Sequence, residues 1–191
     1  YGDKELKQAA INNLKQKLRN SINQSPELTK SYFELALCDG LGFDAQSLDG
    51  GLDGSFVYEN APESLSAGIK GIECVRSDLQ QTLSVSLADV VAYAGAEACE
   101  AIGAPRIVVQ LGRSDANAKN KKEPAFNIFG DHSEASVSAA KRLFVASGLS
   151  VKDIVALLCA HGELRRTLKE VLSKAPSKKA DGNADADVSD D

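Results

Sequence analysis

The feature that most constrains the fold of this 191-residue chain is a series of helical hydrophobic patterns, several of them with start and stop signals. In the first 22 residues, apolar side chains recur in four-residue steps, at Leu6, Ala10, Leu14, Leu18 and Ile22. This spacing puts the apolar side chains on one face of a helix and leaves the lysines and glutamines on the other. The segment 3–22 is therefore predicted to be an amphipathic helix.

A second helix is expected immediately afterwards. Ser25 is a suitable N-cap residue, Pro26 suits the first helical position, and Gly40 is a plausible stop. Capping-box spacing, in which Ser or Asn is followed three residues later by an acidic residue, then occurs at Asn60/Glu63, Ser86/Asp89 and Ser150/Asp153. We expect helices over 60–79, 86–103, 132–148 and 150–172, with Gly103 and Gly148 closing two of them.

The segments between these patterns read as loops. Glycine and aspartate are dense over 40–59, where they favour turns, and residues 112–132 are polar and contain the basic run KNKKE. The stretch RIVVQL at 106–111 has strand composition, but no partner strand is visible and a single strand is not stable alone. The predicted fold class is therefore all-α.

Charge is concentrated at the C-terminus. The last eleven residues contain five aspartates and no basic residue, and without them 22 acidic residues match 22 basic ones. A nearly neutral body without a basic stripe makes nucleic acid an unsuitable partner. From Ser173 onward the chain lacks large apolar residues, so we expect an acidic tail that becomes ordered only when a partner binds it.

No apolar run approaches the roughly 20 residues of a membrane-spanning helix, so no transmembrane segment is predicted. The N-terminal YGDKELKQ has no targeting pattern, and the chain contains no methionine. We expect a processed product or a fragment.

The cysteines and histidines form no recognisable metal motif. The four cysteines, Cys38, Cys74, Cys99 and Cys159, are far apart in sequence and lie in helical patterns, which favours buried thiols, with disulfides only in an oxidising compartment. The calcium-loop resemblance of DGGLDGSFVYEN fails at Gly51 and Asn60, which stand where oxygen ligands are needed. His132 and His161 fall on different elements, so no metal site is predicted, and His161 taken alone reads as a core histidine.

Two stretches resemble the plant-type haem peroxidase family, in its ascorbate-peroxidase branch. LSVSLADVVAYAGAEACEAIGAPRIVVQLGRSDA resembles the family's helix and Gly-Arg-x-Asp loop, through Ala88, Asp89, Gly112, Arg113 and Asp115. GLSVKDIVALLCAH resembles the proximal helix, with His161 at the position of the haem ligand. The resemblance covers residues 3 to 166 and implies a truncated haem-peroxidase-like helical fold, divided into a distal-type lobe 1–120, a remnant of the proximal lobe 121–172 and a tail 173–191.

The resemblance also implies a degenerate distal site. Glu34, Leu37 and Cys38 stand where active members carry arginine, tryptophan and histidine, and the roles of those residues in peroxide cleavage are not met by these replacements. Ser66 matches the asparagine that orients the distal histidine, and Gly162 follows the ligand position where the family has threonine. We therefore expect no catalytic residues, no metal and no cofactor, with His161 holding haem only if haem is bound, and we predict that the chain is not an enzyme.

The pattern is similar to ascorbate-peroxidase-like proteins of the chloroplast. It implies an accessory subunit on the lumenal face of a photosynthetic membrane complex in the plastid thylakoid, with photosystem II preferred and photosystem proteins as partners. One alternative is a divergent peroxidase that uses ascorbate or a small phenol, with His161 as axial ligand and Cys38, Asp39 or Glu34 as distal groups. The other is a thiol-based redox sensor built on Cys38 and Cys159.

Overall fold

The computed structural model describes residues 2–58, 61–80, 84–116 and 134–174. In these ranges the chain forms six α-helices and one short 3-10 helix. Their bounds are α1 Gly2–Gln24, α2 Leu28–Gly40, η1 Ser55–Tyr58, α3 Glu63–Leu79, α4 Leu87–Ala101, α5 Glu134–Ala146 and α6 Val151–Lys174. The described residues contain no strand, and the all-α prediction is confirmed.

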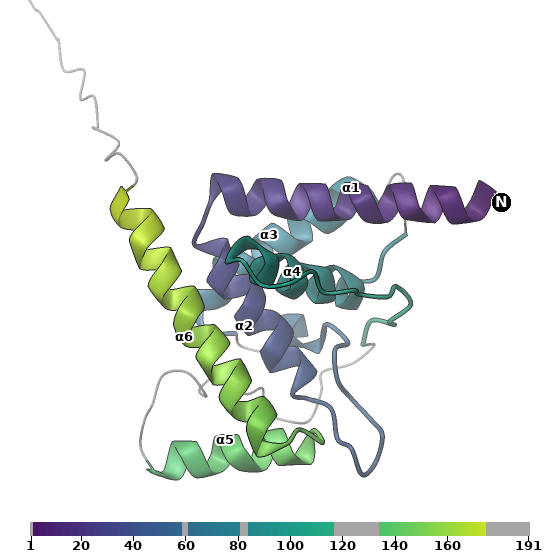
Figure 1. Cartoon of the computed structure of the whole chain (residues 1–191). Coiled ribbons are helices and arrows are strands. Elements are labelled where there is room, and N and C mark those ends of the chain that lie inside the picture. The colour runs from purple at the N-terminus through teal and green to yellow at the C-terminus, as the bar shows by residue number, and fades with distance from the viewer. Residues whose placement is uncertain (1, 59–60, 81–83, 117–133, 175–191) are drawn as a thin grey trace, which may run out of the picture.

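Helix α2 is the centre of the arrangement, because it packs against α1, α3, α4 and α6. Figure 1 shows α1 lying across one end of the molecule, with α6 sloping past α2 toward α5 at the other end. The core consists of apolar side chains that these helices turn inward, and the following are fully buried: Leu14, Leu18, Tyr32, Leu35, Ile72, Leu79, Val90 and Val91. Leu14 and Leu18 come from the four-residue pattern of the first helix, as predicted.

Four of the predicted helix signals are confirmed. The Ser86 hydroxyl accepts a hydrogen bond from the Asp89 backbone N–H at 3.1 Å and caps α4. At the start of α6 the capping is reciprocal, because Asp153 N–H donates to the Ser150 hydroxyl and Ser150 N–H donates to the Asp153 carboxylate at 2.8 Å. Gly103 and Gly148 follow α4 and α5 with φ of 95° and 80°, the left-handed conformation of a C-terminal stop.

Two predicted helix starts are wrong. Helix α2 begins at Leu28 because Ser25 and Pro26 form a turn, in which the Ser25 carbonyl accepts from Leu28 N–H. Glu27 is then the N-cap, without a side-chain capping bond. Helix α3 begins at Glu63 because Pro62 is extended, with φ −55° and ψ 143°, and takes the N-cap position expected for Asn60. Asn60 itself lies outside the described residues.

The segment RIVVQL, residues 106–111, is irregular, so its strand-like composition does not produce a strand. It runs back alongside α4 (Figure 1) and is held there by the Tyr93 hydroxyl, which donates to the Val109 carbonyl at 2.7 Å. The glycine-rich loop before η1 forms the predicted turns, with one isolated bridge between Asp44 and Asp49.

Within the described ranges, no helix alone has the length and hydropathy of a membrane span; α5 and α6 meet that standard only as a pair bent by 119°. His132 and most of the acidic tail lie outside the described residues. The predicted division into lobes 1–120 and 121–172 stays a prediction.

Candidate functional site

The residues that carry the family resemblance meet at the start of α4. The Asp89 carboxylate accepts hydrogen bonds from Gly112 N–H at 2.7 Å and from the Arg113 guanidinium at 3.1 Å. One oxygen of Asp115 accepts from Ala88 N–H at 3.0 Å. These contacts fasten the segment after α4 to the first turn of that helix. The Gly-Arg-x-Asp motif therefore has a structural role in this chain, which is to hold the segment after α4 in place.

Three ionisable side chains lie on one face of α2. Lys30, Glu34 and Cys38 follow one another at four-residue steps, which places them on the same side of the helix. The Lys30 ammonium lies 2.9 Å from the Glu34 carboxylate. The Glu34 side chain is 7% exposed, so this carboxylate is buried and needs partners.

The second partner of Glu34 comes from α6. Helix α6 turns Ile154, His161 and Leu164 inward, at spacings that fall on one face. His161 Nε2 lies 2.6 Å from Glu34 Oε1, and the His161 side chain is also 7% exposed. The Phe33 ring stacks on the imidazole at 6.3 Å between centroids. Residues 127 positions apart thus join in one buried contact.

The electrostatics of Glu34 follow from these neighbours. Burial acts to raise the pKa of the carboxyl, but hydrogen bonds from His161 and Lys30 outweigh it, and the pKa is lowered from its ordinary value. Glu34 is therefore an anion at neutral pH, held between two donors.

The remaining candidate residues on α2 are Cys38, Asp39 and Leu37, and they differ in their chemistry and surroundings. Cys38 is 3% exposed, and burial together with the nearby Glu34 and Asp39 carboxylates raises the pKa of its thiol to about 12. Burial raises the pKa of Asp39 to about 7, although its carboxylate accepts from Gly54 N–H at 2.9 Å. Leu37 lines an apolar hollow of about 520 Å³ between α2, α4 and the segment after α4. A thiol, a carboxyl and an apolar side chain supply no positive charge to stabilise the oxyanion that leaves when peroxide is cleaved.

The expectation that all four cysteines are buried is wrong for two of them. Cys74 and Cys159 are exposed and Cys99 is half-buried. Cys159 lies about 200° around α6 from His161, so it cannot face the same crevice as Cys38. All four cysteines, each in the described part of the chain, are thiols. The arrangement does not support the redox-sensor alternative based on Cys38 and Cys159.

The remaining predicted positions are scattered. Ser66 is half-buried on α3, and Gly162 is exposed on α6 with open space where a Cβ would stand. Among the residues that the structure describes, no three His, Cys, Asp or Glu side chains gather as a metal site. Sequence reasoning missed Lys30 and Phe33, although the Lys30 to Glu34 spacing could have indicated an ion pair on the helix.

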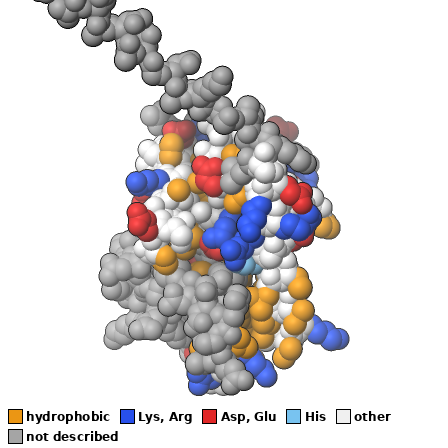
Figure 2. Space-filling model, turned by 90° about the vertical axis from the view of Figure 1, so that its left-hand side faces the viewer, with side chains coloured by type: hydrophobic (Ala, Val, Ile, Leu, Met, Phe, Trp, Pro, Cys, Tyr) orange, Lys and Arg blue, Asp and Glu red, His pale blue; other side chains and the backbone are white. Residues whose placement is uncertain are grey.

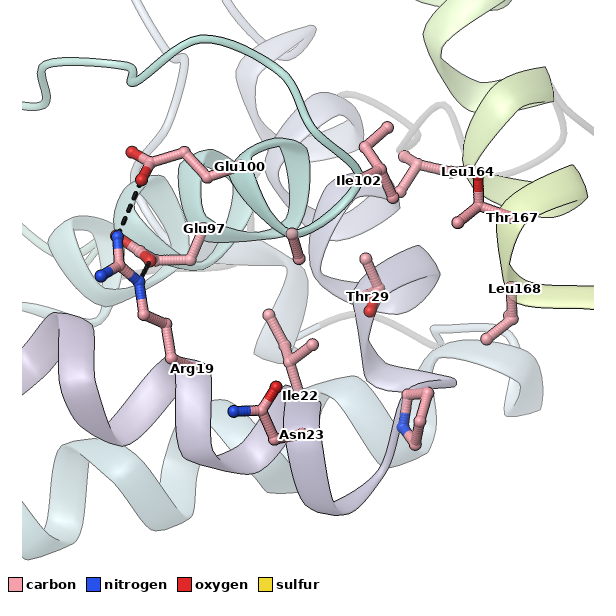
Figure 3. A pocket seen from close by; sticks show the side chains of 12 residues that line it. Arg19, Ile22, Asn23, Thr29, Glu97, Glu100, Ile102, Leu164, Thr167 and Leu168 are labelled. Atoms are coloured by element: carbon pink, nitrogen blue, oxygen red, sulfur yellow. Dashed lines mark hydrogen bonds and ion pairs between the residues drawn. The ribbon is translucent and has the colours of Figure 1, made fainter. Parts of the chain in front are cut away.

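A second hollow, of about 470 Å³, lies between α1, α2, α4 and α6 (Figure 3). At one end Glu97 and Glu100 both pair with Arg19, and the Lys15 ammonium lies 3.0 Å from Glu97. Two acids thus face two bases, so the hollow presents no unmatched charge to a ligand. Its other end is apolar, with Ile22, Ile102 and Leu168 in its lining.

Comparison with known proteins decides the family. A model of the peroxidase family matches residues 11–188. The chain belongs to the peroxidase family.

Three Arabidopsis thaliana proteins are examples of the relatives to which this peroxidase-family chain is similar. It is 28% identical to Peroxidase 30 over 75% of the chain, 32% identical to "Putative L-ascorbate peroxidase 6" over 66%, and 26% identical to Peroxidase 5 over 80%. The matches span 44%, 38% and 49% of those proteins, so the chain covers less than half of each relative.

These relatives correct one expectation. The prediction that the chain is not an enzyme is wrong by this comparison, because the family and the matched proteins are named as peroxidases. The recognition of the peroxidase family is confirmed, and the similarity includes an ascorbate-peroxidase name.

Membership of this family implies haem, and the crevice between α2 and α6 allows a test of fit. Iron ligation by His161 would need a ring nitrogen with open space before it. In the structure, Glu34 Oε1 stands 2.6 Å from Nε2 of His161. A tetrapyrrole inserted there would need van der Waals contact on both faces, a separation of roughly 7 Å. The arrangement of Glu34 and His161 therefore does not fit haem.

Proposed function

We propose that this peroxidase-family chain acts as an accessory protein of a photosynthetic membrane complex, docked on the lumenal face of the thylakoid, with photosystem II as the preferred partner. The proposal builds on the similarity to the ascorbate-peroxidase branch. It concerns what the described residues do through their surface, and the activity of the whole protein remains a separate proposal.

The observation that carries this proposal is an exposed apolar row on α5 and α6. The row consists of five side chains that are 40% to 58% exposed, namely Val137, Val145, Val151, Val155 and Leu158. Figure 2 shows hydrophobic side chains gathered low on one face of the molecule, with basic side chains at the margin. Exposed apolar side chains that gather on one face are typical of protein docking sites.

Binding to purified photosystem II tests the docking role. We expect the chain to co-migrate with photosystem II complexes on native gels, and Val155→Asp with Leu158→Asp to weaken that binding at least tenfold. A charge placed in the apolar row would have to be desolvated on docking. Val108→Asp is the matched control, because Val108 is an apolar side chain that is 83% exposed but lies outside the row. Equal binding of both variants would contradict the role of the row.

The lumenal location has its own test. In sealed thylakoid vesicles the chain should resist added protease until detergent opens the membrane. Degradation without detergent would place the chain on the other side and overturn this part of the proposal.

A second candidate function is a divergent peroxidase that uses ascorbate or a small phenol, with His161 as the axial ligand of haem, which would require the Glu34–His161 contact to open. The names of the relatives favour this candidate. The purified chain, loaded with ferric haem, should then oxidise ascorbate or guaiacol with peroxide, and His161→Ala should abolish turnover. Activity that is absent in the loaded chain, or unchanged in His161→Ala, would exclude it.

A further inference from the structure

The contact between Glu34 and His161 has two effects on the same nitrogen. Glu34 Oε1 lies 2.6 Å from Nε2, so the atom through which the ring faces α2 is already engaged. The contact also holds α6 against α2 at the middle of α6, with Phe33 stacked on the ring. The Glu34 carboxylate therefore both engages Nε2 of His161 and helps to keep the crevice between α2 and α6 closed.

The surroundings favour the closed state. Both side chains are 7% exposed, so separating them would leave a carboxylate and an imidazole buried without this mutual contact. Lys30, 2.9 Å from the carboxylate, compensates its charge and is itself 29% exposed in its side chain. A salt bridge on one side and a buried hydrogen bond on the other keep Glu34 ionised and in place.

We infer that Glu34 is a specific haem-excluding residue, whose carboxylate blocks His161 Nε2 and keeps α6 closed on α2. The inference does not rest on the proposed docking function. Substitutions usually weaken the binding of a ligand, whereas removing the Glu34 side chain should give the chain a capacity to bind haem. Without the carboxylate, Nε2 loses its contact with Oε1 and the crevice loses a contact that holds it closed.

Titration with ferric protoporphyrin IX tests this inference. The wild-type chain and His161→Ala should bind the porphyrin equally weakly. Glu34→Ala should bind it at least tenfold more tightly, with the absorption spectrum of imidazole-ligated iron. Glu34→Ala combined with His161→Ala should lose the gain. Tight binding by the wild-type chain through His161, or a gain that persists in the double variant, would overturn the inference.

Two further variants separate specific exclusion from loosening of the fold. Ile154→Ala removes a buried contact of α6 with the Leu41 and Phe144 cluster and leaves Glu34 unchanged. It should not increase porphyrin affinity, and an increase equal to that of Glu34→Ala would overturn the specific role. If Glu34→Ala does not fold, as judged by circular dichroism, Glu34→Ser provides the test, because its short side chain leaves the space before Nε2 open and keeps a polar group on α2. A threefold or larger gain in affinity is expected for Glu34→Ser, and no gain would overturn the inference.

Discussion

Gly95 of α4 faces Ala36 of α2 so closely that a Cβ added to Gly95 would lie 2.5 Å from the Ala36 Cβ. Real Cβ atoms do not approach to this distance, so Gly95→Ala must push the two helices apart. Overpacking costs about 1–3 kcal/mol, and alanine returns about 1 kcal/mol through its better helix propensity. We expect Gly95→Ala to lower the free energy of unfolding by about 1 kcal/mol in urea titrations.

Gly162→Ala is the control for helix propensity. Gly162 also lies inside a helix, but a Cβ added to it would meet no atom within 4 Å. This substitution should raise the free energy of unfolding by about 0.5–1 kcal/mol. Equal effects of the two substitutions would show that α2 and α4 tolerate the added methyl group.

Glu97 is 1% exposed and pairs with Lys15, which is 8% exposed, and with Arg19. Removal of one partner from a buried ion pair costs about 3–5 kcal/mol when nothing else compensates the remaining charge. Glu100 still lies 3.5 Å from the Lys15 ammonium and pairs with Arg19, so Glu97→Gln should destabilise the chain by about 2 kcal/mol, less than that full cost, in urea titrations. Glu163→Gln, which affects an exposed pair with Arg166, should change stability by less than about 1 kcal/mol.

Thiol reactivity should differ among the cysteines. Cys38 is buried and its pKa is raised to about 12, so almost no thiolate exists at pH 8, whereas Cys74 and Cys159 are exposed. In the native chain we expect a chromogenic disulfide reagent to label Cys74 and Cys159 within minutes and Cys38 only after unfolding. Peptide mapping identifies the labelled residues, and rapid labelling of Cys38 would contradict this account of the crevice.

Asp39 makes stability depend on pH between about 4 and 7. Burial raises its pKa from 3.8 to about 7, so in this interval the folded chain binds a proton that the unfolded chain has lost. Stability from this group is therefore present below pH 4 and declines as pH rises to about 7. Asp39→Asn should gain stability relative to the wild-type chain over that interval in thermal melts. Parallel curves for the two chains would disprove the shift.

Glu34 acts with the opposite sign. Its pKa is lowered in the folded chain, so its contribution to stability is present above the ordinary value of 4.5 and is lost as pH falls through the lower folded value. Melts of Glu34→Gln should thus approach those of the wild-type chain at the acid end. A difference between the two chains that stays constant down to pH 3 would be inconsistent with the lowered pKa.

The helices could be predicted because the evidence for them is local. Capping by Ser86 and Ser150 depends on residues three positions away, and the apolar face of α1 depends on a repeat within one segment. The start of α2 was missed because a turn at Ser25 competed with the N-cap. A strand at RIVVQL could not be predicted for the opposite reason, since a strand needs a partner from elsewhere in the chain. In the structure Tyr93 holds this segment and Asp89 holds the glycine that follows it, without a partner strand.

The candidate site depended on contacts that sequence cannot supply. The resemblance singled out Glu34 and His161 separately, but it assigned them to opposite sides of a crevice. That their side chains touch depends on how α6 lies on α2, which is set by tertiary packing between distant segments. Burial of Glu97 was likewise unpredictable, because a glutamate in a helix is most often solvated.

The Glu34–His161 contact also bears on how this chain can evolve. A substitution at either position removes a buried partner of the other, so the effect of a change at position 161 depends on the residue at position 34. Such epistasis restricts the order of accessible substitutions. Any path that gives Nε2 of His161 a different partner must alter Glu34, and the intermediate sequence carries the cost of losing this buried contact.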